Sequence, residues 1–257
     1  MISACGQQFT LALDTPNGRL TAMIAQVGAG LRSLKLGETE FVESCEPDEI
    51  APYCAGIVMS PWVNRLDGGK WTYKGQVLEV PITIHDQQNA NHGLLEFAEY
   101  RLIDRTDNAT ESSVTLAATI QPRRGYPFLV ETTVKYALSA DGLTVTHGAE
   151  NKSVDAAPYA VGGHPYLRVS GTPTEELVLK APATSVIDVD ARQIPIGRSS
   201  VAGTKFDLRQ GQRVGDNFFD HNFGDLEREA DGMAHTYLTA PNGGQVDVWQ
   251  DEAFKYV

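Results

Sequence analysis

VETTVKYAL, residues 130–138, decides the fold, because its apolar and polar side chains alternate with a period of two. In an extended chain one face carries the side chains suited to burial, namely Thr132, Val134, Tyr136 and Leu138. The opposite face carries Glu131, Thr133 and Lys135. This alternation is typical of an antiparallel strand with one face in the core and the other in solvent. The pair Asp141-Gly142 follows where a tight hairpin turn is expected, and LTVTHGAEN (143–151) continues as a strand.

The same period of two recurs along the chain, in FTLALDT (9–15), VTLAATIQ (114–121), HTYLTAP (235–241) and QVDVWQ (245–250). Turn signals such as Pro16-Asn17-Gly18 separate these runs. No segment has the pattern of an amphipathic helix over three turns. The sequence therefore predicts an all-β protein, a large sandwich of antiparallel sheets.

The length of 257 residues fits a single large β-domain over 1–257, since sandwiches and barrels often reach roughly 250 residues. With 42% hydrophobic and 21% charged residues, the chain can bury a core and does not resemble a disordered protein. We expect one globular domain.

The net charge of −12 argues against binding to nucleic acid or to an anionic membrane, because both need clustered Lys and Arg. No apolar run reaches the ~18 to 20 residues of a membrane span, and MISACGQQFTLALDT has no signal-peptide pattern. We expect a cytoplasmic protein with a small neutral ligand. Its three widely spaced cysteines, Cys5, Cys45 and Cys54, are expected to be free thiols.

Motifs for metal or nucleotide binding are missing from the sequence. There is no HxH, no HExxH and no cysteine pair, and neither GxxxxGK[ST] nor GxGxxG occurs. A serine nucleophile elbow, GxSxG, is absent as well. We therefore expect no metal and no cofactor, although a metal site assembled from distant strands stays open.

In three short stretches, a polar residue lies beside glycine, proline or apolar residues. In VGGHPYLRV (161–169), two glycines and a proline interrupt a strand around His164, whose imidazole suits proton transfer near neutral pH. In SPWVNRLDGGKW (60–71), Arg65 offers a fork of donors for hydroxyls or a carboxylate, or else forms a salt bridge at a strand end. In NANHGLLEF (89–97), His92 is either a catalytic residue or a structural, hydrogen-bonded histidine.

Taken together, these motifs resemble the aldose 1-epimerases, also called galactose mutarotases. The resemblance covers nearly the whole chain and rests on seven stretches in the family's order. They are PWVNRLDGGKWTYKG (61–75), NHGLLEF (91–97), GYPF (125–128), GLTVTHGAEN (142–151), GGHPYLRV (162–169), FDLRQGQRVGDNFFDHNF (206–223) and DEAFKYV (251–257). The family's large antiparallel β-sandwich agrees with the fold predicted from the period of two.

The resemblance implies roles for particular residues. His164 corresponds to the general acid that protonates the ring oxygen of the sugar, and His92 to a second histidine that hydrogen-bonds the sugar near that oxygen. Arg65 and Asp220 correspond to groups that hold sugar hydroxyls. Asn64 and Tyr166 are neighbours of these residues in the motifs.

The implied reaction interconverts the α and β anomers of a free hexose such as galactose or glucose. An acid protonates the ring oxygen while a base removes the proton of the C1 hydroxyl, so that the ring opens and closes again. This chemistry needs neither metal nor nucleotide. The expected partner is the sugar alone, bound by a monomer or homodimer.

One feature of the family has no counterpart here. Its general base is a glutamate in a stretch beyond the segment that resembles DEAFKYV, and this sequence ends at Val257. Glu252 lies before the relevant position and is not given that role. We expect a chain that lacks its C-terminal strands, rather than a natural variant without the base.

Two other functions stay open. A non-catalytic protein of the same fold would bind a sugar through Arg65, His92 and Asp220 without turning it over. A sugar-phosphate epimerase would need basic residues around the C6 end of the sugar, for which Arg123, Arg124 and Arg168 are available. The preferred hexose does not follow from the sequence.

Overall fold

The computed structural model describes residues 3–46, 48–169 and 171–257, and their regular secondary structure is almost entirely β-strand, which confirms the all-β prediction. They form two compact units, Met1–Tyr166 and Leu167–Val257. The single domain over 1–257 stays a prediction. The cysteines Cys5, Cys45 and Cys54 are free, as predicted. Within the described ranges, no helix is long and apolar enough to cross a membrane.

In the described part of the first unit, the chain forms fourteen strands and a 3-10 turn. The strands are β1 (Gln8–Thr15), β2 (Gly18–Ala25), β3 (Leu31–Leu36), β4 (Thr39–Glu40), β5 (Val58–Met59), β6 (Arg65–Asp67), β7 (Lys70–Tyr73), β8 (Gln76–Glu79), β9 (Asn89–Asn91), β10 (Arg101–Asp107), β11 (Ser112–Ile120), β12 (Val130–Ser139), β13 (Gly142–Asn151) and β14 (Gly162–Gly163). The 3-10 turn η1 spans Pro52–Cys54.

The hairpin of β12 and β13 has the predicted alternation. Every second side chain of β12, from Val130 to Leu138, is buried. The turn differs from the prediction by one residue, because Ser139 pairs with Gly142 and the two loop residues are Ala140 and Asp141. Gly142, with φ 124°, is therefore the first residue of β13.

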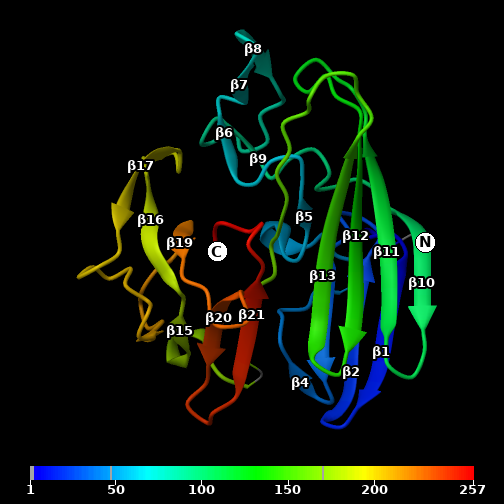
Figure 1. Ribbon diagram of the computed structural model, residues 1–257, viewed down its shortest axis with the longest axis vertical. Helices are drawn as coiled ribbons and strands as arrows, with labels where there is room; N and C mark the ends of the chain where they lie inside the picture. Colours follow the sequence, from blue (N-terminus) through cyan, green and yellow to red (C-terminus); the bar gives the residue numbers. More distant parts are fainter. Residues whose placement is uncertain (1–2, 47, 170) are drawn as a thin grey trace. The chain divides into compact units, whose positions relative to one another are not determined.

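Two four-stranded antiparallel sheets form a sandwich in the first unit. Their strand orders are β1-β2-β3-β4 and β10-β11-β12-β13. Figure 1 shows β1 and β2 alongside β11, β12 and β13, and β1 contacts both β11 and β12. Their inward side chains, among them Leu11, Ile24, Leu116 and Val134, share one core from which water is excluded.

The second unit is also antiparallel. Its strands are β15 (Val178–Lys180), β16 (Ala183–Val189), β17 (Pro195–Ser200), β18 (Gln212–Arg213), β19 (Phe223–Leu226), β20 (Ala234–Thr239) and β21 (Gln245–Gln250), with the 3-10 turn η2 (Thr174–Glu176). They form sheets of order β18-β15-β20-β21 and β17-β16-β19. A small apolar cluster packs against each sheet, one around Phe223 and one around Leu238.

Candidate active site

His164 lies at the end of a very short strand. Strand β14 consists only of Gly162 and Gly163, which pair with Met59 and Val58 of β5. Beyond the strand, the His164 backbone stays anchored: its N–H donates to Ile57 O at 3.1 Å and its carbonyl accepts from Gly56 N at 2.7 Å. The imidazole thus leaves a strand end whose backbone is held on both sides, which fits the predicted interruption of the strand.

Only one of the two glycines before His164 has close neighbours. A Cβ on Gly162 would lie 3.1 Å from Met59 Cε and 3.2 Å from Val63 Cγ2, tighter than ordinary contact. A Cβ on Gly163 would meet only Pro165 Cδ, at 3.7 Å. Position 162 therefore leaves little room for a side chain, whereas the space around position 163 would admit one.

His92 follows strand β9, which pairs with β6 so that Asn91 faces Arg65. Its backbone is left-handed, with φ 54°, and its N–H donates to Asn64 O at 3.0 Å. Asn64 is left-handed too, with φ 62°. Such conformations are costly for residues other than glycine and persist where the surrounding structure enforces them, often at functional sites.

The position after His92 has no room for a side chain. Gly93 has φ 91°, and a Cβ there would lie 1.9 Å from Ser60 O. The backbone of residues 92–93 is thus packed against Ser60, and Leu94 N donates to Ser60 O at 2.7 Å. This contact joins NANHGLLEF (89–97) to SPWVNRLDGGKW (60–71).

The structure brings His92 and His164 into direct contact. Their ring centroids lie 5.0 Å apart, with the ring planes inclined by 64°. The Tyr166 ring lies 5.5 Å from that of His164, and its hydroxyl donates to Tyr53 O at 3.3 Å. Three aromatic side chains from two separate motifs therefore form one cluster.

Burial holds His92 in its neutral form at physiological pH. Its side chain is almost fully buried, and desolvation, followed by the charges of His164 and Arg65, lowers the pKa of His92 to about 4. Its Nδ1 is buried and accepts or donates no hydrogen bond among the described residues. A neutral imidazole with an unused ring nitrogen can hydrogen-bond a ligand without carrying charge.

Arg65 is held in a fixed orientation beside this pair. Its Nη1 donates to Asn64 Oδ1 at 2.7 Å, and its Nε donates to Gln87 Oε1 at 3.1 Å. Both partners are amides rather than carboxylates. Its guanidinium is therefore oriented without being neutralised by these contacts, and it keeps donors for a polar ligand.

Further buried polar atoms lie close in sequence to Arg65 and His92, and the sequence motifs do not identify them as site residues. Ser60 Oγ, Trp62 Nε1 and Asn91 Oδ1 have no hydrogen-bond partner among the described residues. Buried polar groups are normally paired, with protein, water or a ligand. In the sequence, only their positions next to Pro61 and His92 pointed to them.

Four other candidate residues lie in the second unit or in an exposed connection of the first unit. Asp220 lies in the second unit, exposed, in the segment between β18 and β19. Arg168 is in the second unit as well. Arg123 and Arg124 are exposed in the connection between β11 and β12. The role of Asp220 stays a prediction.

Among the described residues, no three His, Cys, Asp or Glu side chains come together in a way that could hold a metal ion. The predicted absence of a metal and of a cofactor stays a prediction.

The sequence of the chain is similar to those of known proteins. The family model for aldose 1-epimerase matches residues 10–251. The chain is 35% identical over 219 residues to YihR, an uncharacterised protein of Escherichia coli K12, covering 85% of this chain and 68% of YihR. It is 25% identical over 231 residues to the aldose 1-epimerase of the same organism, covering 87% of this chain and 63% of that protein, which is less than two thirds of its length.

Solved structures show the same fold. A galactose mutarotase-like protein from Clostridium acetobutylicum superposes with a TM-score of 0.84 at 16% identity, covering 96% of this chain and 79% of the other. A galactose 1-epimerase from Lactobacillus acidophilus NCFM superposes with a TM-score of 0.76 at 20% identity, covering 91% and 77%. The chain belongs to the aldose 1-epimerase family.

Proposed function

We propose that this protein is an aldose 1-epimerase that interconverts the α and β anomers of a free hexose, galactose or glucose. The observation that carries the proposal is the contact between His92 and His164 in the first unit, with the His92 ring neutral and its Nδ1 unused. Family membership supports the reaction class.

In this proposal, His164 is the general acid. Ring opening requires a proton on the ring oxygen as the bond from C1 to that oxygen breaks, and an imidazole has a pKa suited to that transfer near neutral pH. The hydrogen bonds of its own N–H and carbonyl fix the position of the His164 backbone, from which the imidazole extends. General acid catalysis by one positioned group contributes about 10²- to 10⁴-fold to the rate.

His92 and Arg65 hold the sugar in the same proposal. His92 stays neutral and hydrogen-bonds the substrate near the ring oxygen, where a second cation would oppose protonation of His164. Arg65 donates to hydroxyls from an orientation fixed by Asn64 and Gln87. Asp220 and Tyr166 complete the set of residues that hold the sugar, as the family motifs imply.

The base that removes the C1 hydroxyl proton is a glutamate in the family, and we assign that role to no residue among 1–257. A protein that binds the sugar without accelerating anomer exchange is therefore the second candidate. The sugar-phosphate alternative gains no support from Arg123 and Arg124, which are exposed in the connection between β11 and β12.

Polarimetry tests the proposal directly. Freshly dissolved α-galactose and α-glucose should approach equilibrium faster with the protein than in buffer alone, and the excess rate should scale with protein concentration. Calorimetric titration with the equilibrated sugars separates the two candidates. Binding without acceleration would favour the sugar-binding protein, and neither binding nor acceleration would contradict both.

A further inference from the structure

A cavity of about 330 Å³ lies within the second unit, and neither proposed function uses it. Its size falls within the range of small-molecule sites in proteins. Its lining comes from β17, from β19 and the residues after it, and from the C-terminal segment. The lining residues are Arg198, Asp225, Leu226, Arg228, Lys255 and Tyr256.

The charges of the lining do not balance. Asp225 is already paired, since Arg198 Nη1 donates to both of its carboxylate oxygens at 3.1 Å and Ser185 Oγ donates to Oδ2 at 2.6 Å. Arg228 and Lys255 have no carboxylate partner among the described residues. The cavity therefore carries an excess of two positive charges in a chain whose net charge is −12.

Arg228 is held in place by groups that carry no net charge. Its Nη1 donates to Gln250 O at 2.8 Å and its Nη2 to Phe254 O at 3.1 Å. These carbonyls fix the guanidinium without neutralising it. A fixed guanidinium loses little freedom when it binds an anion, which favours binding.

The aromatic wall of the cavity is equally fixed. Arg198 Nη2 donates to the Tyr256 hydroxyl at 2.8 Å, and the guanidinium carbon lies 5.9 Å from the Tyr256 ring centroid. Tyr256 forms a β-bridge with Gly224, where a Cβ would lie 2.9 Å from the Tyr256 ring. The glycine thus leaves room for the ring, and Phe223 and Val257 exchange two backbone hydrogen bonds beside it.

We propose that this cavity binds a small oxyanion of the phosphate type, with Arg228 and Lys255 facing the anion and Tyr256 and Leu226 forming its apolar wall. Two unpaired cations match the charge of a phosphate group near neutral pH, and guanidinium and ammonium groups are the usual donors to phosphate oxygens. The proposal goes beyond the epimerase function and does not depend on it.

Isothermal titration calorimetry with inorganic phosphate, at constant ionic strength and without sugar, tests the proposal. The wild-type protein should bind phosphate saturably at one site, and added salt should weaken binding. Lys255→Gln should raise the Kd about fivefold or more, and Lys255→Glu should abolish binding. Lys255 is exposed, so neither change disturbs a core.

Lys70→Gln is the matched control, because it removes the same charge from an exposed position on β7, in the first unit. It should leave the Kd for phosphate unchanged. Absence of saturable binding, or equal weakening by Lys70→Gln and Lys255→Gln, would overturn the proposal. Glycerol 3-phosphate identifies the source: a lower Kd than that of inorganic phosphate indicates a phosphate ester, and an equal or higher one indicates free phosphate. Because no sugar is present, this result is independent of the polarimetric test.

Discussion

The rings of His92 and His164 lie edge to face with centroids 5.0 Å apart, although the two residues come from distant motifs. Two imidazoles this close disfavour double protonation, and His92, the more desolvated, is the one that stays neutral. The contact with His164 is therefore one of the reasons why His92 stays neutral.

Replacing His164 should remove the acid while leaving the sugar contacts of His92 and Arg65. We expect His164→Asn to lower kcat for mutarotation by about 10²- to 10⁴-fold, with a much smaller change in sugar affinity. Polarimetry gives kcat and calorimetry the affinity. His85→Asn, at an exposed position of the same unit, is the control and should keep full activity. Near-normal turnover in His164→Asn would remove His164 from the acid role.

Arg65 should act through the geometry of its guanidinium. In Arg65→Lys the charge stays, but a lysine cannot make the two oriented contacts with Asn64 and Gln87 and still donate to the sugar. We expect KM to rise about tenfold with a smaller change in kcat, as for a group that binds ground state and transition state alike. A fall in kcat at constant KM would assign Arg65 to the chemical step instead.

Gly93 is expected to be required for folding as well as for the site. A Cβ at this left-handed residue would lie 1.9 Å from Ser60 O, so Gly93→Ala must displace one of the two segments. We expect the free energy of unfolding, measured with urea, to fall by about 3 kcal/mol.

Gly75→Ala provides the matched control for Gly93→Ala. Gly75 has φ 79°, but a Cβ there would meet nothing within 4 Å. It introduces the backbone strain without the clash and should cost only about 1–2 kcal/mol. Equal losses in the two variants would show that the contact with Ser60 carries no energy of its own.

The long strands could be predicted from the sequence, and the site could not. Alternation located the hairpin of β12 and β13 and placed β21 at 245–250, because many alternating residues specify one buried face. The histidines instead follow strands β9 and β14, of three and two residues, which are too short to show a period. The family resemblance named both, but their contact depends on pairing between distant segments. Ser60 Oγ and Trp62 Nε1, which have no hydrogen-bond partner in the part of the chain that the structure describes, can be recognised only when burial is known.

The protonation of His92 should be visible directly. With its pKa lowered to about 4, its imidazole should titrate well below the usual value of about 6.5 in an NMR pH series. The depressed pKa means that this residue's stabilising contribution is present above pH 6.5, the unfolded value, and is lost as the pH falls toward 4. A midpoint near 6.5 for His92 would contradict the burial argument.

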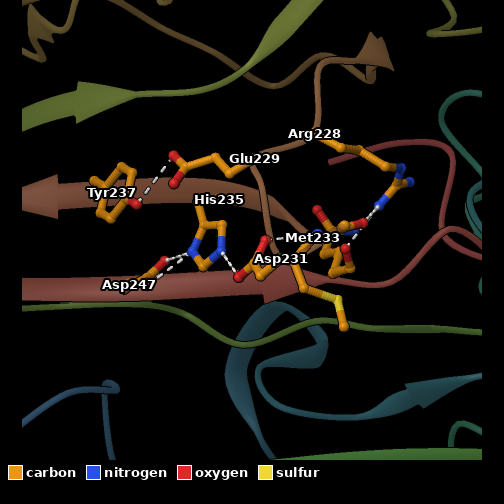
Figure 2. A network of polar contacts seen from close by, with 9 residues as sticks. Arg228, Glu229, Asp231, Met233, His235, Tyr237 and Asp247 are labelled. Carbon is orange, nitrogen blue, oxygen red and sulfur yellow. Dashed lines mark hydrogen bonds and ion pairs between the residues drawn. The ribbon is translucent and has the colours of Figure 1, made fainter.

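His235, in the second unit, should behave in the opposite way. Its Nδ1 lies 2.9 Å from Asp247 Oδ2 and its Nε2 lies 2.9 Å from Asp231 Oδ2, so both nitrogens face carboxylates (Figure 2). Only the imidazolium can donate on both sides. These contacts, the Asp231 hydrogen bond above all, raise the pKa of His235 above its usual value.

Because the folded pKa of His235 is raised, its contribution to stability is fully present below pH 6.5, while the carboxylates are ionised, and is lost as the pH rises through the folded pKa. Urea unfolding of the wild type and of His235→Gln should therefore differ most near pH 5.5 and least near pH 9. The exposed His85→Gln should show no such trend. A difference between wild type and His235→Gln that stays constant across this range would mean that His235 stabilises the β20–β21 hairpin by packing, for instance against the Tyr237 ring stacked 5.8 Å away, and not by its charge.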